Sequence, residues 1–184
     1  MRTLYLERST GDCRDGSWVE TLDLEDVGRI VVGTGPGSFA GIRSAIAFAQ
    51  GYALGTACEV LGLPSACAVA AQVYARESAA AHLPLAVVGD SRRGMAWVAL
   101  FDGYAPTREV FQVEQEDLAG AVPGSCRVVT PNAARIGALL DALFGARYLG
   151  GVMPTVEGLE RFATENPSVL KPEPLPTYLN PAVR

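Results

Sequence analysis

A glycine-rich turn between an apolar strand and a helix of small residues constrains this fold more than any other feature. Residues Val31–Arg43 read V-V-G-T-G-P-G-S-F-A-G-I-R. The β-branched run that begins at Ile30 predicts a strand buried on both faces, and the glycines allow a tight turn or a close backbone approach. Ser38 is a favourable N-cap, so we expect a helix over Ser38–Leu54. The free N–H groups at such a helix start suit an anion or a polar group of a partner.

The expected strands and helices follow an order that occurs twice. The first set comprises strands at Thr3–Arg8, Ser17–Leu22, Gly28–Val32 and Ala57–Leu61 and helices at Ser38–Leu54 and Pro64–Ala81. The second set comprises strands at Pro84–Gly89, Gly94–Phe101, Thr107–Val113 and Arg127–Val129, helices at Asn132–Phe144 and Glu157–Glu165, and an extended tail at Lys171–Arg184. Antiparallel strands followed by a β-α-β unit, in both sets, predict a mixed-sheet α/β fold with two related halves.

The composition argues against several classes of function. Apolar residues make up 49% of the chain, as in a globular protein, and a formal net charge of −5 argues against a protein that grips nucleic acid by itself. His82 is the only histidine, which excludes two-histidine metal sites and argues against a histidine base. Lys171 is the only lysine, so no P-loop lysine is present. We therefore assign no catalytic or metal-ligating residue.

The cysteines and the hydropathy pattern indicate a cytoplasmic protein. None of the four cysteines forms a C-x-x-C pair, and we expect reduced thiols; they are Cys13, Cys58, Cys67 and Cys126. No apolar run is long enough to span a bilayer, and no secretory signal follows Met1.

General phosphate-binding and nucleophile motifs fit the glycine turn poorly, with one exception. Walker A fails because Ala40 stands where a glycine is required and no lysine follows, and the nucleophile elbow fails for lack of its glycines. The dinucleotide fingerprint does match over Gly35–Ala40, with Glu59 at a suitable spacing to meet a ribose. A nucleotide-binding enzyme therefore remains an alternative, with Gly35, Gly37 and Ser38 as the phosphate-binding residues, although the antiparallel strands before the turn are unlike a Rossmann start.

Four segments together resemble one known family. Gly33–Arg43 resembles the G-x-G-P-G-S-F-T-G-[LI]-R signature of the TsaB (YeaZ) family, and Thr3–Thr10 resembles that family's opening strand I-L-A-L-D-T-S-T. Asp90–Arg92 with the strand after it resembles the strand–D-A-R–strand hairpin, and Pro176–Leu179 resembles the terminal P-x-Y-L. The resemblance spans nearly the whole chain.

This resemblance implies an RNase H-like fold of the actin-like ATPase superfamily, with a shortened lobe over residues 1–82 and a reduced second lobe over residues 83–184. Members of the family are non-catalytic subunits that pair with a homologous TsaD in making threonylcarbamoyladenosine in tRNA. We therefore expect a TsaD-like partner, a TsaE-like ATPase beside it, a homodimer in isolation, and only indirect contact with tRNA. No cofactor is expected on the isolated chain, and ATP or ADP is expected only at a subunit boundary.

The helix after the turn is the interface that we expect to meet a TsaD-like subunit or a second copy. Its small side chains make it thin enough for another backbone to approach closely. The alternative is that these side chains only fit the helix against its own sheet. The interface residues expected are Gly37, Ser38, Phe39, Gly41, Ile42, Arg43, Ala45, Ile46 and Ala49.

Two departures from the family pattern bear on function. Glu7 and Arg8 replace the Asp and Thr of the first-strand motif, which weakens the case for nucleotide hydrolysis. The short segment between Thr10 and Ile30 lacks room for the family's usual further strand and long first helix. The protein either associates through a reduced surface or is a divergent, self-associating relative outside the tRNA pathway.

A few polar and aromatic residues have two interpretations. Glu7 and Asp90 fall at equivalent strand ends and could form a paired-carboxylate metal site, although capping carboxylates are more common. We expect Arg92 and Arg93, beside Asp90, to form a turn with an internal salt bridge, with a contact to tRNA phosphate as the alternative. Trp18 and Trp97 are expected in the sheets.

Overall fold

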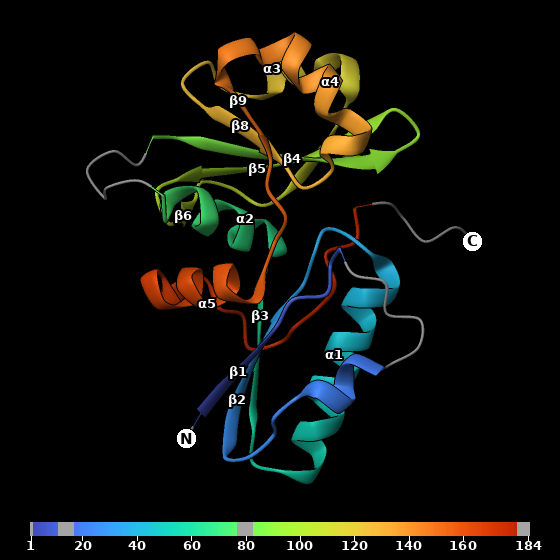
Figure 1. Cartoon of the computed structure of the whole chain (residues 1–184), viewed down its shortest axis with the longest axis vertical. Coiled ribbons are helices and arrows are strands. Elements are labelled where there is room, and N and C mark those ends of the chain that lie inside the picture. The colour runs from blue at the N-terminus through green and yellow to red at the C-terminus, as the bar shows by residue number, and fades with distance from the viewer. Residues whose placement is uncertain (1, 11–16, 77–82, 180–184) are drawn as a thin grey trace. The chain divides into compact units, whose positions relative to one another are not determined.

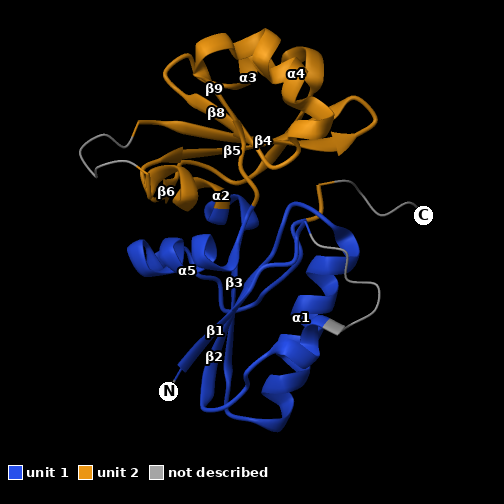
Figure 2. Ribbon diagram, in the orientation of Figure 1, with its two compact units in different colours: residues 1–68, 154–177 blue, residues 69–153, 178–184 orange. Residues whose placement is uncertain are grey.

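The structure, a computed structural model, describes residues 2–10, 17–76 and 83–179. They form two compact units, shown in different colours in Figure 2. Unit 1 comprises residues 1–68 and 154–177, and unit 2 comprises residues 69–153 and 178–184.

This division differs from the predicted lobes at 1–82 and 83–184, because the chain returns to unit 1 after unit 2. The returning segment holds helix α5 (Val156–Glu165), which contacts strand β1 (Arg2–Leu6) and whose Leu159 and Phe162 are fully buried. Apolar contact with the first sheet therefore decides where this segment belongs.

The sheet of unit 1 has three parallel strands in the order β1-β2-β3 (Figure 1). Strand β2 (Val27–Gly33) lies in the middle, and β3 (Glu59–Leu63) forms the second edge. The β-branched residues of β2 from Ile30 to Val32 are fully or almost fully buried, as their sequence predicts.

The segment between β1 and β2 is a 3-10 helix, η1 (Ser17–Thr21), so the predicted strand over Ser17–Leu22 is wrong. Since β1 and β2 are parallel, no hairpin can join them directly. Trp18 lies in this turn of helix and packs edge-on against Phe48, at a ring distance of 5.5 Å. A tertiary aromatic contact thus overrides the strand preference of the segment, and Trp18 is not a sheet residue.

Helix α1 (Phe39–Gly55) begins after Ser38, whose side chain accepts a hydrogen bond from the Gly41 N–H at 3.3 Å, and it packs on β2 and β3. The predicted helix over Ser38–Leu54 and its N-cap are confirmed. Helix α2 (Ser65–Tyr74) follows β3, and the boundary between the units falls within it. The last part of the predicted helix Pro64–Ala81 lies outside the described residues.

The proline-rich tail covers the β3 edge of the first sheet. Lys171 and Gly62 exchange two backbone hydrogen bonds, at 2.7 and 2.9 Å, in an antiparallel bridge. Farther along, the Thr177 N–H donates to the Thr34 carbonyl at 2.8 Å. An extended segment with few N–H groups is well suited to end a sheet at this edge.

Unit 2 has a larger, six-stranded mixed sheet. Its strands are β4 (Leu85–Arg92), β5 (Met95–Asp102), β6 (Ala105–Pro106), β7 (Phe111–Glu114), β8 (Arg127–Thr130) and β9 (Tyr148–Gly151). Strand β5 pairs antiparallel with β4, and β8 and β9 continue the sheet in parallel. The prediction missed β9, because its Y-L-G-G sequence has no apolar alternation, and the strand predicted at Thr107–Val113 begins only at Phe111.

Besides the last part of α2, unit 2 contains the short helix α3 (Leu118–Ala121) and helix α4 (Ala133–Phe144), which packs on β8 and β9. The core between this helical layer and the sheet includes Val88, Val98, Val128 and Leu140. The predicted α/β arrangement is therefore present in both units, but the predicted mixed sheet is present only in unit 2, since the three strands of the unit 1 sheet are all parallel.

The β4–β5 pair depends on a glycine opposite a tryptophan. Gly89 pairs with Trp97, and a Cβ atom at position 89 would overlap the indole ring of this buried side chain. Trp97 thus lies in the sheet, as predicted.

We expect Gly89→Ala to lower the free energy of unfolding by about 1–3 kcal/mol, because the buried indole ring must shift to admit a methyl group. Urea unfolding followed by circular dichroism measures this loss. The matched control is Gly120→Ala, at an exposed position where an added Cβ meets no atom within 4 Å. Equal stability of the two variants would contradict the packing role of Gly89.

Candidate functional site

The glycine turn of unit 1 joins the end of β2 to the start of α1. Gly35 has φ +90°, a conformation that favours glycine, and a Cβ there would lie 2.6 Å from Ile42 Cδ1. A Cβ at Gly37 would overlap the Ser9 carbonyl oxygen, which accepts the Ser38 N–H. The turn is therefore held directly against the segment that follows β1.

Ser65, at the start of α2, fixes the other side of the turn. Its hydroxyl oxygen accepts the Gly35 N–H at 3.0 Å, and its own N–H donates to the Gly35 carbonyl at 2.8 Å. The Thr34 N–H donates to the Leu63 carbonyl at 2.9 Å. Hydrogen bonds within unit 1 thus fix the backbone of the turn.

These bonds bear on the alternative that Gly35, Gly37 and Ser38 bind phosphate. The N–H groups of Gly35 and Ser38 already donate within the chain, and the backbone of Gly37 is packed on Ser9. Glu59, the expected ribose contact, forms an ion pair with Arg29 at 2.7 Å. A phosphate cradle requires free N–H groups directed at the ligand, so this geometry disfavours that alternative.

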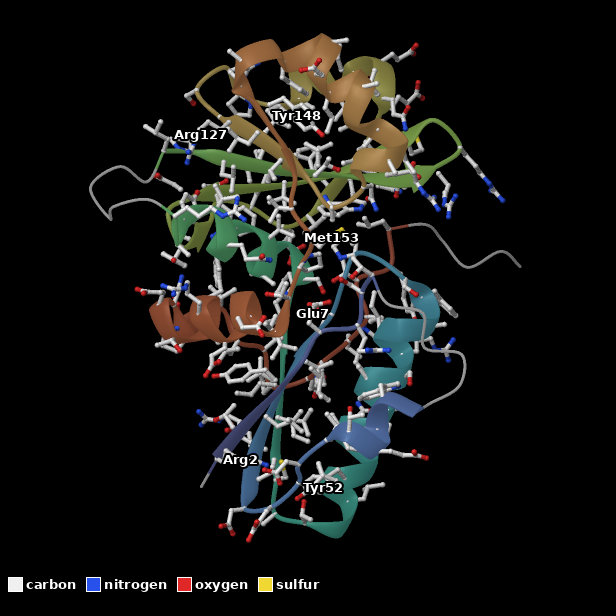
Figure 3. The ribbon with its side chains drawn as sticks, in the orientation of Figure 1. Arg2, Glu7, Tyr52, Arg127, Tyr148 and Met153 are labelled. Atoms are coloured by element: carbon white, nitrogen blue, oxygen red, sulfur yellow. The ribbon has the colours of Figure 1, made fainter. Side chains whose placement is uncertain are left out.

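Glu7, at the end of β1 (Figure 3), lies beneath the turn. Its Oε1 accepts the Ser9 N–H at 2.8 Å, while its buried Oε2 accepts no hydrogen bond from the described residues. A Cβ at Gly33 would overlap this Oε2 atom, so glycine at position 33 makes room for the carboxyl group. Burial raises the pKa of Glu7, and polar groups of Ser9 and Ser65 partly oppose the rise.

Asp90, in unit 2, is in a different environment. Its Oδ2 lies 3.1 Å from the Arg135 guanidinium and 3.9 Å from that of Arg92. Its Oδ1 accepts the Arg92 N–H at 3.0 Å, and its own N–H donates to the Asn132 side chain at 2.9 Å. The predicted turn with an internal salt bridge is confirmed for Arg92, and both Arg92 and Arg93 have positive φ there.

The paired-carboxylate hypothesis gains no support from this geometry. Glu7 and Asp90 belong to different units, and each has its own local partners. Over residues 2–10, 17–76 and 83–179, no group of three or more His, Cys, Asp or Glu side chains is arranged to hold a metal ion.

The expected interface residues of α1 divide into two sets. Five of them are buried within unit 1, four in its apolar core, and cannot form a surface: Gly41, Ile42, Ala45, Ile46 and Ala49. For these five the structure contradicts the interface assignment, because they lie on the buried side of α1, where Ile42 and Ile46 fill the core and the small Ala45 and Ala49 let the helix approach its sheet. Ser38 is half-buried and serves as the N-cap, whereas Gly37, Phe39 and Arg43 are exposed.

The exposed side of α1 carries a continuous stripe that the interface prediction captured only at its start. We call it the α1 outer face: Phe39, Arg43, Ala47, Gly51 and Leu54. Phe39 is 58% exposed and Leu54 91%, and a Cβ at Gly51 would meet no atom within 4 Å. The Arg43 guanidinium lies 4.9 Å from the centre of the Phe39 ring. Helical spacing counted onward from Phe39 is the signal that identifies Ala47, Gly51 and Leu54.

Comparison with known proteins gives one family and related structures. The family model that matches is TsaD, described as tRNA N6-adenosine threonylcarbamoyltransferase, over residues 20–121, more than half of the 184 residues. Comparison with curated protein sequences found no match.

Two solved structures are similar over almost their whole length. YeaZ from Pseudomonas aeruginosa matches with a TM-score of 0.72 and 21% identity, over 96% of this chain and 99% of that chain. A crystal structure of an uncharacterized protein with similarity to peptidase YeaZ, also from Pseudomonas aeruginosa, matches with a TM-score of 0.70 and 19% identity, over 97% of this chain and 99% of that chain. These likenesses confirm the predicted fold.

In the described part of the chain, no helix has both the length and the apolar character needed to cross a bilayer.

We expect Glu7→Gln to remove a pH dependence of stability. Because the folded state raises the pKa of Glu7, it holds this proton at pH values where the unfolded chain has released it. The free energy of unfolding should therefore fall as pH rises from the ordinary glutamate pKa through the raised one, and the glutamine variant should lack this fall. Urea unfolding from about pH 4 to about pH 9 measures it.

The matched control is Glu25→Gln, at an exposed position, which should keep the pH dependence of the unsubstituted protein. Parallel stability curves for Glu7→Gln and the unsubstituted protein would show that Glu7 titrates alike in the folded and unfolded states.

Proposed function

The chain belongs to the TsaD family, which involves it in tRNA modification, and from this premise we propose that it is a non-catalytic subunit that pairs with a TsaD-like threonylcarbamoyltransferase. The observation that carries the proposal is the α1 outer face, an exposed stripe beside a turn whose own polar groups bond internally. Unit 1 thus offers a surface suited to a protein partner, and its turn is poorly suited to a reactant.

The surroundings of the reactive side chains support a non-catalytic role. Glu7 is enclosed beneath the turn, and Asp90 is held by arginine. Burial raises the pKa of the Cys67 thiol and of the Cys126 thiol, which keeps both protonated near neutral pH and weakly nucleophilic. None of these four groups combines the access and the ionisation state that a nucleophile or general base requires.

The composition of the α1 outer face suits a protein interface. Phe39 and Leu54 can bury apolar area, and the small Ala47 and Gly51 let another backbone come close. Arg43 adds a cation that can pair with a partner carboxylate. The net charge of −5 is consistent with indirect contact with tRNA, through the TsaD-like subunit.

The proposal extends to the rest of the complex. Any ATP or ADP would bind at a subunit boundary, and a TsaE-like ATPase would join the assembled pair. The isolated chain is expected to bind no nucleotide, because the turn has its Gly35 and Ser38 N–H groups engaged.

We expect Ala47→Glu to abolish co-purification with the TsaD-like subunit of the same organism, since a bulky charge would replace a small side chain at the centre of the α1 outer face. Pull-down from co-expressing cells measures the loss. The matched control is Ala138→Glu, the same substitution at an exposed alanine of helix α4, which should bind as the unsubstituted protein does. Undiminished binding by Ala47→Glu would refute this interface.

A further inference from the structure

Two enclosed oxygen atoms beneath the glycine turn have no hydrogen-bond partner among the described residues. One is Oε2 of Glu7, labelled in Figure 3, and the other is Oγ of Ser9, a residue only 2% exposed. Buried polar atoms of folded proteins are almost always paired with protein groups or bound water, and the exceptions call for an explanation such as an ion. Two such atoms on neighbouring residues therefore indicate a ligand that the chain itself does not supply.

The Glu7 carboxyl group also lacks a positive partner. In the parts of the chain that the structure describes, none of the ion pairs includes Glu7. The Cys67 thiol lies near it on α2, but this thiol is buried and protonated and brings no positive charge. Enclosing a carboxylate without a compensating charge is strongly unfavourable. The compensation must therefore come from a proton or from a bound cation.

Oxygen atoms from separate segments border the space beside Glu7. A Cβ atom at Gly33 would overlap Glu7 Oε2 and would lie 2.9 Å from Ser65 Oγ, so the absent side chain leaves these two oxygens facing the same space. The Ser65 hydroxyl is held in place because it accepts the Gly35 N–H at 3.0 Å. Polar groups of Ser9 and Ser65 also lower the pKa of Glu7, which indicates that both hydroxyl groups lie beside its carboxyl group.

We propose that Glu7, Ser9 and Ser65 bind one alkali cation, sodium or potassium, beneath the glycine turn. Carboxylate and hydroxyl oxygens are the ligands that hard cations prefer, and the three residues supply no nitrogen or sulfur ligand. The single carboxylate balances one positive charge. Calcium takes six to eight oxygen ligands and magnesium requires a near-ideal octahedron, so a monovalent ion fits this small set better than a divalent one.

The ion would connect segments that are distant in the sequence. Glu7 and Ser9 follow β1, whereas Ser65 begins α2. The Ser9 carbonyl accepts the Ser38 N–H, so an ion that holds Ser9 also helps to fix the start of α1. It would take the place of the proton that the enclosed carboxyl group otherwise holds. Its role would be structural, because Glu7 Oε2 is shielded from solvent.

The test is urea unfolding of the full chain at about pH 8, above the ordinary glutamate pKa, in sodium, potassium or tetramethylammonium chloride at equal ionic strength. Tetramethylammonium is too large for the space beside Gly33. We expect a higher urea midpoint in sodium or potassium, which rises with the salt concentration and then levels off, since a ligand of the folded state alone stabilises by mass action. The alkali ion that acts at the lower concentration identifies the occupant.

Equal midpoints in the three salts would overturn the proposal, because a proton or a water molecule beneath the turn would give no difference between them. Glu7→Gln should abolish the difference, whereas the control Glu25→Gln, at an exposed position, should keep it. A difference that persists in Glu7→Gln would also overturn the proposal, since it would arise elsewhere in the protein.

Ser9→Ala decides the matter if Glu7→Gln fails to fold. This substitution removes an oxygen that makes no hydrogen bond to the described residues. It should raise the alkali-ion concentration needed for half of the effect by about tenfold, the usual consequence of losing one interaction with a charged group. The control is Ser168→Ala, at an exposed position, which should leave that concentration unchanged. An unchanged concentration in Ser9→Ala would refute the site.

Discussion

The close contact between the glycine turn and the segment after β1 is the constraint on which unit 1 depends. The turn can reach this segment only because Gly33 and Gly37 lack side chains where Glu7 and the Ser9 backbone lie. That contact fixes the start of α1 through Ser38, whose N–H donates to the Ser9 carbonyl. It also encloses the Glu7 carboxyl group, so one packing arrangement determines both where the helix begins and why the charge of Glu7 is suppressed.

Small residues serve two purposes on opposite sides of α1. On the inner side, Ala45 and Ala49 let the helix approach its own sheet, as the alternative to an interface predicts for these residues. On the outer side, Ala47 and Gly51 leave an open, thin surface between two exposed apolar side chains, Phe39 and Leu54. Both sides of the helix carry small residues, so composition alone does not show which side faces the sheet. The orientation of the helix about its own axis decides this.

The sequence predicted those elements that depend mainly on neighbouring residues. The β-branched run of β2 and the N-cap at Ser38 correctly predicted the position of the turn, and neither depends on contacts between distant parts of the chain. Tertiary contacts decided the rest: Trp18 packs on Phe48 and turns an expected strand into a 3-10 helix. Likewise, the short weak strand β9 exists because β8 offers it an edge. The enclosure of Glu7 could not be predicted, since it requires knowing which glycine lies above it.

Unit 1 is assembled from two stretches of chain separated by most of unit 2. Helix α5 and the tail that bonds Gly62 are synthesised only after β4 to β9. Most of unit 2 is therefore synthesised before the first sheet receives the helix that packs on β1 and the tail that pairs with β3. Contacts across so long a separation form slowly, and unpaired strand edges favour aggregation in the interval. A nascent chain cut before residue 154 would lack helix α5 and the tail, and would leave the β3 edge of the first sheet unpaired at Gly62.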